Sequence, residues 1–121
     1  MFHVSRISSK IKMSCNLSDC VGEAHLVVEA VDEDLAVKQS LFAELECLVS
    51  PQTILAHHSQ SLTIEQISQR MNRRENFGGV QFYPPVHVSK MVKIIKCITT
   101  SQATFEALDH FGTQMGKETV R

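Results

Sequence analysis

A chain of 121 residues has room for one modest domain, and 43% hydrophobic with 21% charged residues is an ordinary globular balance. The net charge of −1 and the pI of about 6.6 exclude the strongly basic surface of a dedicated nucleic-acid-binding protein. No stretch approaches the roughly 20 apolar residues that cross a bilayer, so we expect no membrane span.

The cysteines and the charged N-terminal segment bear on metal binding and targeting. The four cysteines include no CxxC pair and follow no secretory signal, so we expect reduced, buried thiols and no metal site. Residues 1–15 carry three bases and no acid. This segment is open to two interpretations, an organelle-targeting segment or a strand in which Ile7, Ile11 and Met13 alternate with other residues, and we favour the strand.

The first half of the chain alternates helical and extended patterns. Asn16 or Ser18 can cap a short helix through Ala24, and residues 25–30 (HLVVEA) are an apolar run suited to a strand buried on both faces. Acids at residues 32–34 mark a helix N-terminus. Apolar residues then follow at helical spacing as far as the proline at position 51.

The middle of the chain adds a strand, a helix and a loop. Residues 53–56 (TILA) predict a buried strand, and Thr63 with Gln66 forms a capping-box pattern at the start of a short helix. Residues 71–79 (MNRRENFGG) predict a polar loop whose two arginines form a solvated turn rather than a phosphate clamp.

The C-terminal part predicts two strands, a helix and a final strand. The strands cover residues 80–83, stopped by two prolines, and residues 90–97. Ser101 caps a helix that Gly116 closes in a left-handed conformation, and a short strand from Glu118 follows. This alternation predicts an α/β domain with a mostly parallel sheet and helices on both faces. No GxGxxG or GxxxxGK[ST] motif is present, so motifs alone indicate no phosphate-binding loop.

Three segments carry a resemblance to a known family. They are LVVEAVDEDLAVKQSLFAEL (26–45), VQFYPPVHVSKMVKIIK (80–96) and TSQATFEALDHFGTQMGK (100–117). Together they resemble the NAD-binding domain of the L-3-hydroxyacyl-CoA dehydrogenases, and most of all that of the monofunctional enzyme of fatty-acid β-oxidation. The resemblance runs from about residue 5 to residue 120. It implies a partial Rossmann-like fold for residues 1–121.

The resemblance implies an oxidoreductase that transfers a hydride between NAD and the 3-hydroxyl group of an acyl-CoA. In the family a histidine is the general base and a glutamate orients it. By resemblance the histidine falls on Gln81, the glutamate on Lys93, and a serine that reaches substrate and cofactor on Gln60. A glutamine amide does not titrate near neutral pH, and an ammonium cannot replace an orienting carboxylate. No catalytic residue of the family is therefore retained.

Other matched positions concern the cofactor. A family asparagine falls on Pro84, which offers no side-chain amide, whereas Ala30, Glu33 and Lys38 match cofactor contacts of the family. Each of these three also has a purely structural interpretation: a small residue at a strand end, an acid at a helix N-terminus, and the solvated face of an amphipathic helix.

The resemblance also implies missing parts. The family opens with a βαβ unit that carries the Gly-rich phosphate loop and ends with a helical domain, and we expect neither in this chain. In a sheet ordered 3-2-1-4-5-6, the absent first two strands would leave residues 25–30 without their partner and with an open edge. NAD binding by this chain is therefore doubtful.

Three functional hypotheses follow. The chain is an inactive, truncated relative; or it is an enzyme completed by a longer form or a complete subunit; or it is a non-catalytic module that pairs with a full-length dehydrogenase subunit. The resemblance implies an acyl-CoA substrate and the mitochondrial matrix, with the cytoplasm as the alternative location.

Overall fold

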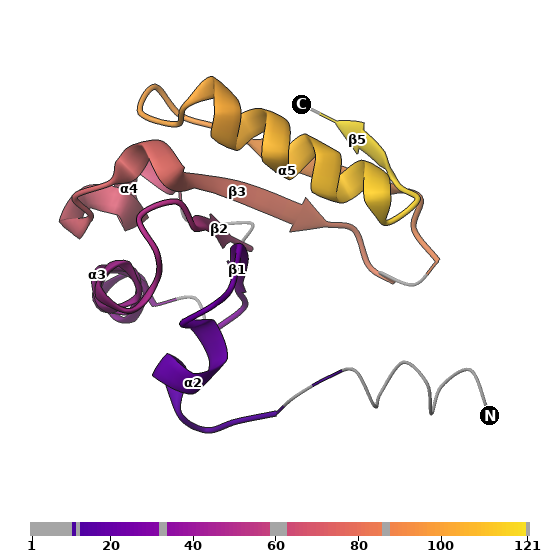
Figure 1. Cartoon of the computed structure of the whole chain (residues 1–121). Coiled ribbons are helices and arrows are strands. Elements are labelled where there is room, and N and C mark those ends of the chain that lie inside the picture. Colours follow the sequence, from indigo (N-terminus) through magenta and orange to yellow (C-terminus); the bar gives the residue numbers. More distant parts are fainter. Residues whose placement is uncertain (1–10, 12, 32–33, 59–62, 86–87, 121) are drawn as a thin grey trace.

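The computed structural model describes residues 11, 13–31, 34–58, 63–85 and 88–120 (Figure 1). Three segments lie outside or largely outside these ranges: the N-terminal segment predicted as a strand or a targeting sequence, the acids at 32–33 and the residues 59–62. The elements, in chain order, are α2 (Leu17–Val21), β1 (Leu26–Glu29), α3 (Leu35–Leu48), β2 (Ile54–His57), α4 (Ile64–Ile67), η1 (Ser68–Arg70), η2 (Arg74–Asn76), β3 (Phe77–Phe82), β4 (Met91–Ile95), α5 (Gln102–Gln114) and β5 (Glu118–Val120).

Local sequence signals start the helices where predicted, but α2 ends at Val21 and not at Ala24 as expected. The side chains of Asn16, Asp34 and Ser101 each accept a hydrogen bond from a backbone N–H of the first turn of α2, α3 and α5. Thr63 and Gln66 form the predicted capping box at α4. Gly116 follows α5 with a φ of 75°, the left-handed conformation expected of a helix-closing glycine.

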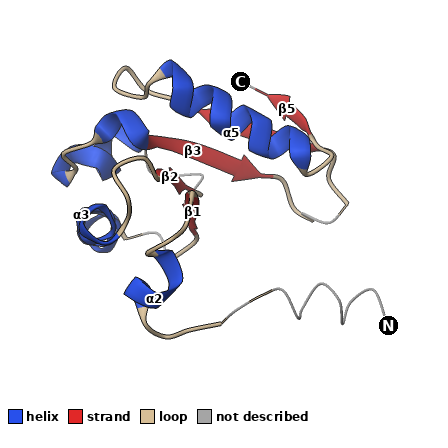
Figure 2. Cartoon of the chain, viewed as in Figure 1, coloured by secondary structure: helices blue, strands red, loops and turns tan. Residues whose placement is uncertain are grey.

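The five strands form one sheet whose spatial order follows the chain, β1-β2-β3-β4-β5. Figure 2 colours the strands red and the helices blue. The pairs β1 with β2, β2 with β3, and β4 with β5 are parallel, and β3 with β4 is antiparallel. The predicted α/β class and mostly parallel sheet are confirmed. No helix within the described ranges is long and apolar enough to cross a membrane.

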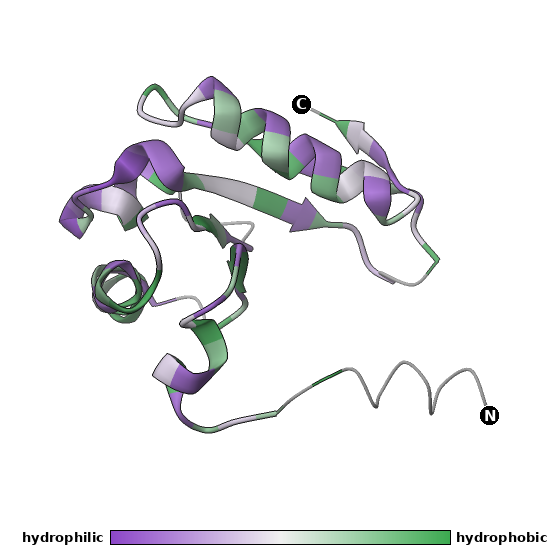
Figure 3. Ribbon diagram, viewed as in Figure 1, coloured by the Kyte–Doolittle hydropathy of each residue, from purple (hydrophilic) through white to green (hydrophobic). Residues whose placement is uncertain are grey.

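Each face of the sheet has its own core, so the predicted helices on both faces are also confirmed. On one face, Phe42 and Leu45 of α3 and Ile67 of α4 pack with Leu55 and Phe77 of the sheet. On the other face, α5 packs on the sheet in a cluster made of Ala56, Val80, Val92, Ile94, Phe105 and Leu108. Figure 3 shows apolar residues concentrated in β1 and β2 and hydrophilic residues around α4.

The prediction that residues 25–30 would have no partner strand is wrong. β1 pairs with β2 along its whole length, from Leu26 with Ile54 to Glu29 with His57, because the α3 crossover returns the chain beside it. The opposite edge of β1 borders no strand of the described residues.

The predicted loop at 71–79 is also wrong in its last three residues, because β3 begins at Phe77. Gly78 lies inside this strand, and a Cβ atom there would lie 2.6 Å from Cδ1 of Leu108. Its glycine therefore permits close packing of α5 on the sheet rather than marking a turn. The cysteines differ from prediction as well: all are free, but Cys15, Cys20 and Cys47 are exposed and Cys97 is half-buried.

Candidate functional site

The polar residues of interest gather at the carboxyl ends of the parallel strands, where ligands bind in open α/β sheets. The register places Glu29 beside His57, His57 beside Gly79, and Gln81 beside Lys93. Side chains alternate between the two faces of a strand, so these residues share one face of the sheet, the face covered by α3 and α4. The site is thus built where β1, β2 and β3 end.

A buried ionic cluster occupies the β1–β2 part of this face. The Glu29 carboxylate accepts hydrogen bonds from Nζ of Lys38 at 2.7 Å, from Nδ1 of His57 at 2.7 Å and from the backbone N–H of Val31 at 2.6 Å. A carboxylate only accepts, so Nδ1 of His57 carries the hydrogen in this contact. Lys38, Glu29 and His57 are 0%, 4% and 3% exposed. Such a cluster holds α3 against the sheet.

Of the matched cofactor positions that the structure describes, Lys38 joins this cluster. The alternative that Lys38 lies on a solvated helix face is wrong, since its side chain is fully buried. Ala30 directly follows β1 and is exposed, and Glu33 lies outside the described residues. Sequence reasoning missed Glu29 and His57. The available signal was an acid inside an otherwise apolar strand, a residue that is rarely buried unless it is paired.

Gln81 and Lys93 face one another directly across the antiparallel β3–β4 pair. Both side chains are half-buried. An amide opposite an ammonium provides no group that takes up a proton near neutral pH, so this pair cannot act as a general base. Pro84 follows β3 and is exposed, and Gln60 lies outside the described residues. Of the four altered positions, the structure therefore brings Gln81 and Lys93 together.

The described residues do not form a dinucleotide cradle. Such a cradle needs glycines between a strand end and a helix N-terminus, where backbone N–H groups meet a phosphate. The glycines instead follow α2, lie within β3 and α5, or close α5. The Lys38 ammonium is bound by Glu29 in the interior. No histidine, cysteine, aspartate or glutamate cluster of metal-binding size occurs in the described ranges.

One thiol has a perturbed pKa. Partial burial acts to raise the pKa of Cys97, but hydrogen bonds with the Thr100 and Thr99 hydroxyls and backbone groups outweigh it, so the pKa lies below its usual value. The Sγ atom lies 3.0 Å from Oγ1 of Thr99 and 3.5 Å from Oγ1 of Thr100.

The sheet order, the flanking helices and the strand-end cluster define a Rossmann-like α/β domain. Known structures agree. The dehydrogenase part of a multifunctional enzyme from Caenorhabditis elegans superposes with a TM-score of 0.91 at 26% identity, over 97% of this chain and 27% of that one. The 3-hydroxybutyryl-CoA dehydrogenase of Escherichia coli gives 0.85 at 31% identity, over 89% and 23%.

Sequence comparison gives the family. The family model described as "3-hydroxyacyl-CoA dehydrogenase, NAD binding domain" matches residues 2–121, and the chain belongs to this family. A probable 3-hydroxyacyl-CoA dehydrogenase of C. elegans is 38% identical over 117 residues, and the human mitochondrial hydroxyacyl-coenzyme A dehydrogenase is 39% identical over 117. Both alignments cover 97% of this chain but only 38% and 37% of the relatives.

Proposed function

We propose that this chain is a catalytically silent member of the 3-hydroxyacyl-CoA dehydrogenase family. One observation carries the proposal: Gln81 and Lys93 are direct neighbours across β3 and β4. By resemblance, these are the positions of the general base and of the glutamate that orients it. Two independent substitutions would fall on neighbouring residues only by coincidence. The loss of one functional pair, in contrast, changes two residues that are partners in the sheet, as Gln81 and Lys93 are.

The chemical cost of the change is large. Removal of a general base alone lowers a rate by roughly 10²- to 10⁴-fold. Lys93 adds a positive charge beside the position where a cationic imidazolium would form during proton abstraction, so restoring the histidine alone would leave an unfavourable neighbour. Both positions must change for proton transfer to return.

The direct test measures NADH formation by the purified chain with NAD and a 3-hydroxyacyl-CoA, beside the human mitochondrial relative as positive control. We expect no NADH above the rate without protein. Saturable NADH formation that depends on the acyl-CoA concentration would contradict the proposal.

A chimera tests the pair itself. In this chimera, residues 2–121 replace the matching segment of the probable 3-hydroxyacyl-CoA dehydrogenase of C. elegans. That protein supplies the remaining 62% of its own length. We expect the chimera to be inactive and the double variant Gln81→His with Lys93→Glu to recover turnover. The matched control, Gln81→His with Lys96→Glu, makes the same charge change on an exposed residue outside the pair and should stay inactive. A folded, inactive double variant would show that other differences abolish the reaction.

The cellular setting belongs to the same proposal. We assign the chain to the mitochondrial matrix and to fatty-acid β-oxidation, with support from the human relative, whose name places it in mitochondria. Fractionation of cells that express the tagged protein tests this assignment, and recovery of the chain in the cytosolic fraction alone would contradict it.

The open edge of β1 favours a second candidate function, a non-catalytic module that pairs with a full-length dehydrogenase subunit. β1 has a strand partner on one side only among the described residues, and Leu26 and Val28 are half-buried. A free strand edge is a template for pairing. Co-purification with the probable 3-hydroxyacyl-CoA dehydrogenase of C. elegans would support this role. The variant Val28→Lys should abolish the co-purification, and the control Gln52→Lys, at an exposed residue, should preserve it. A monodisperse monomer that binds no such subunit would contradict it.

A further inference from the structure

Two thiols flank the start of α2. Cys15 precedes the capping residue Asn16, and Cys20 is the fourth residue of the helix. Side chains at these two positions of a helix start often pack against one another, as they do in a hydrophobic staple. Both cysteines are free and exposed, so a reagent in solution has access to either thiol. The sequence thus places two accessible thiols where the start of a helix brings side chains together.

The chain bends back over the first turn of α2 at this place. The Ser14 hydroxyl accepts from the backbone N–H of Asn16 at 3.0 Å, and the Asn16 side chain accepts from the N–H of Ser18 at 3.1 Å. The Cys20 thiol donates to the backbone oxygen of Ser14 at 3.7 Å. That oxygen belongs to the peptide group that joins Ser14 to Cys15. Sγ of Cys20 therefore lies beside the backbone of Cys15.

This arrangement is close to the one that a disulfide requires. The peptide oxygen that Cys20 contacts is bound to the group that carries Cα of Cys15, so Sγ of Cys20 lies within roughly 6.5 Å of that Cα atom. The Cα atoms of a disulfide are usually about 4.4–6.8 Å apart. The bond would close a ring of only residues 15–20, and an exposed disulfide in so short a ring is readily reduced again.

The helix that carries Cys20 is anchored in the core. Val21 is buried, and Leu17 packs against the same apolar cluster as Val21. Figure 1 shows α2 as a separate turn below α3 and β1. The two thiols therefore meet at the exposed side of a helix whose other side is fixed.

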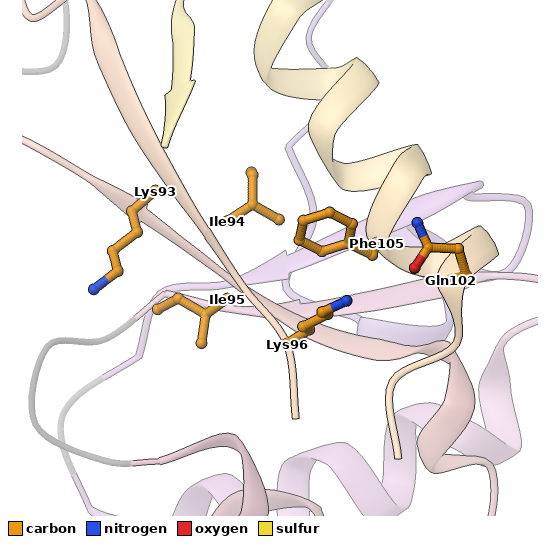
Figure 4. A pocket seen from close by; sticks show the side chains of 6 residues that line it. All are labelled: Lys93, Ile94, Ile95, Lys96, Gln102 and Phe105. Atoms are coloured by element: carbon orange, nitrogen blue, oxygen red, sulfur yellow. The ribbon is translucent and has the colours of Figure 1, made fainter. Parts of the chain in front are cut away.

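The other two cysteines have contacts of their own on other elements. The Cys47 thiol, on α3, donates to the backbone oxygen of Ala43 at 3.6 Å. Cys97 directly follows Lys96, a lining residue of the cavity of about 330 Å³ that Figure 4 shows at the end of β4. Its Sγ atom lies 3.0 Å from the Thr99 hydroxyl. These two thiols serve as internal controls for the pair at α2.

We propose that Cys15 and Cys20 are a reversible thiol–disulfide site, which a small disulfide such as oxidised glutathione converts into an intrachain disulfide. One cysteine loses its proton, and its thiolate attacks oxidised glutathione and displaces one glutathione thiolate. The thiolate of the second cysteine attacks this mixed disulfide and displaces the other. The cysteines lose two electrons and two protons, which leave in two molecules of reduced glutathione. This modification goes beyond the loss of catalysis proposed above and does not depend on it.

Peptide mass spectrometry tests the proposal on the full chain, after equilibration with mixtures of reduced and oxidised glutathione and alkylation of the remaining thiols. Trypsin releases residues 13–38 as one peptide, which holds Cys15 and Cys20 and no other cysteine. We expect this peptide to be lighter by two hydrogens and not alkylated. Its equilibrium constant for oxidation should be roughly tenfold higher in the folded chain than in urea, because folding raises the effective concentration of the thiols. Asn16→Ala, which removes the helix cap, should lower that constant about two- to threefold.

Matched variants separate this pair from general thiol reactivity. The control Cys47→Ser removes an exposed thiol of α3 and should leave the constant unchanged. Cys20→Ser removes one partner, so glutathione should remain attached to Cys15. If the parent peptide carried only glutathione or alkyl groups, the proposal would be overturned. Equal oxidation in the folded and unfolded chains would also overturn it, as would a disulfide between two copies of the chain in non-reducing electrophoresis. Circular dichroism confirms that each variant is folded before it is scored.

Discussion

The buried carboxylate of Glu29 permits a quantitative test, the substitution Glu29→Gln. Glutamine has nearly the same volume as glutamate, so the change leaves packing intact and removes one charge. In the parent, Glu29 accepts from Lys38, His57 and the backbone of Val31 at 2.6 to 2.7 Å. The variant keeps the Lys38 ammonium in the interior but takes this carboxylate away from it.

The expected loss of stability is large. Removing one partner of a buried ion pair costs about 3–5 kcal/mol, and a chain of this size unfolds with a free energy of only about 5–15 kcal/mol. The amide also replaces one accepting oxygen with a donating NH₂ group, which cannot accept from both Lys38 and His57. We therefore expect a variant that is folded only marginally at room temperature.

Urea denaturation followed by circular dichroism measures the free energy of unfolding. The control Glu44→Gln removes an exposed acid on α3, the helix that carries Lys38, and should change stability by no more than about 0.5 kcal/mol. The double variant Glu29→Gln with Lys38→Met removes both charges and should regain at least half of the loss. A loss below about 1 kcal/mol for Glu29→Gln would refute the view that this cluster is a stabilising ion pair.

Three other predictions concern glycines and a thiol. Gly112→Ala should lower the free energy of unfolding by about 1–2 kcal/mol in urea, since its Cβ would lie 2.8 Å from branched side chains of β4 and β5 despite the better helix propensity of alanine. Gly116→Ala should cost about 1–2 kcal/mol in the same assay because of its φ of 75°, and unchanged stability would contradict this. The rate of Cys97 alkylation increases as the thiol ionises, and this increase should occur at lower pH in the folded chain than in urea, because folding lowers the pKa of Cys97. In the folded Thr99→Val variant the increase should occur at higher pH than in the folded parent. Identical dependence of the alkylation rate on pH in the folded parent and in Thr99→Val would contradict this last prediction.

The fold was largely predictable because local signals agreed with tertiary packing. Asp34 and Thr63 each begin a helix at the predicted place, since a capping side chain acts on the backbone beside it. Position 78 shows where such reasoning fails. Its glycine looks like part of a turn, but the side chain that requires it, Leu108, lies 30 residues later in the chain, which local patterns cannot report.

The candidate site also has one part that could be predicted from the sequence and one part that could not. The neighbourhood of Gln81 and Lys93 followed from the family resemblance and is matched by the strand register. The Glu29 cluster could not be predicted, because its three side chains come from β1, α3 and β2 and meet only after the crossover is folded. A periodic pattern records which face a residue occupies, not which charged residue from another element faces it.

The order of the strands has a consequence for how the sheet assembles. Because β1 to β5 lie side by side in the order of the chain, each strand from β2 to β5 pairs with the strand just before it in the sequence. Loop closure is short at each step, which favours rapid folding. During synthesis on a ribosome, the preceding strand has already left the exit tunnel when the next strand emerges. The sheet can therefore extend strand by strand as the chain is synthesised.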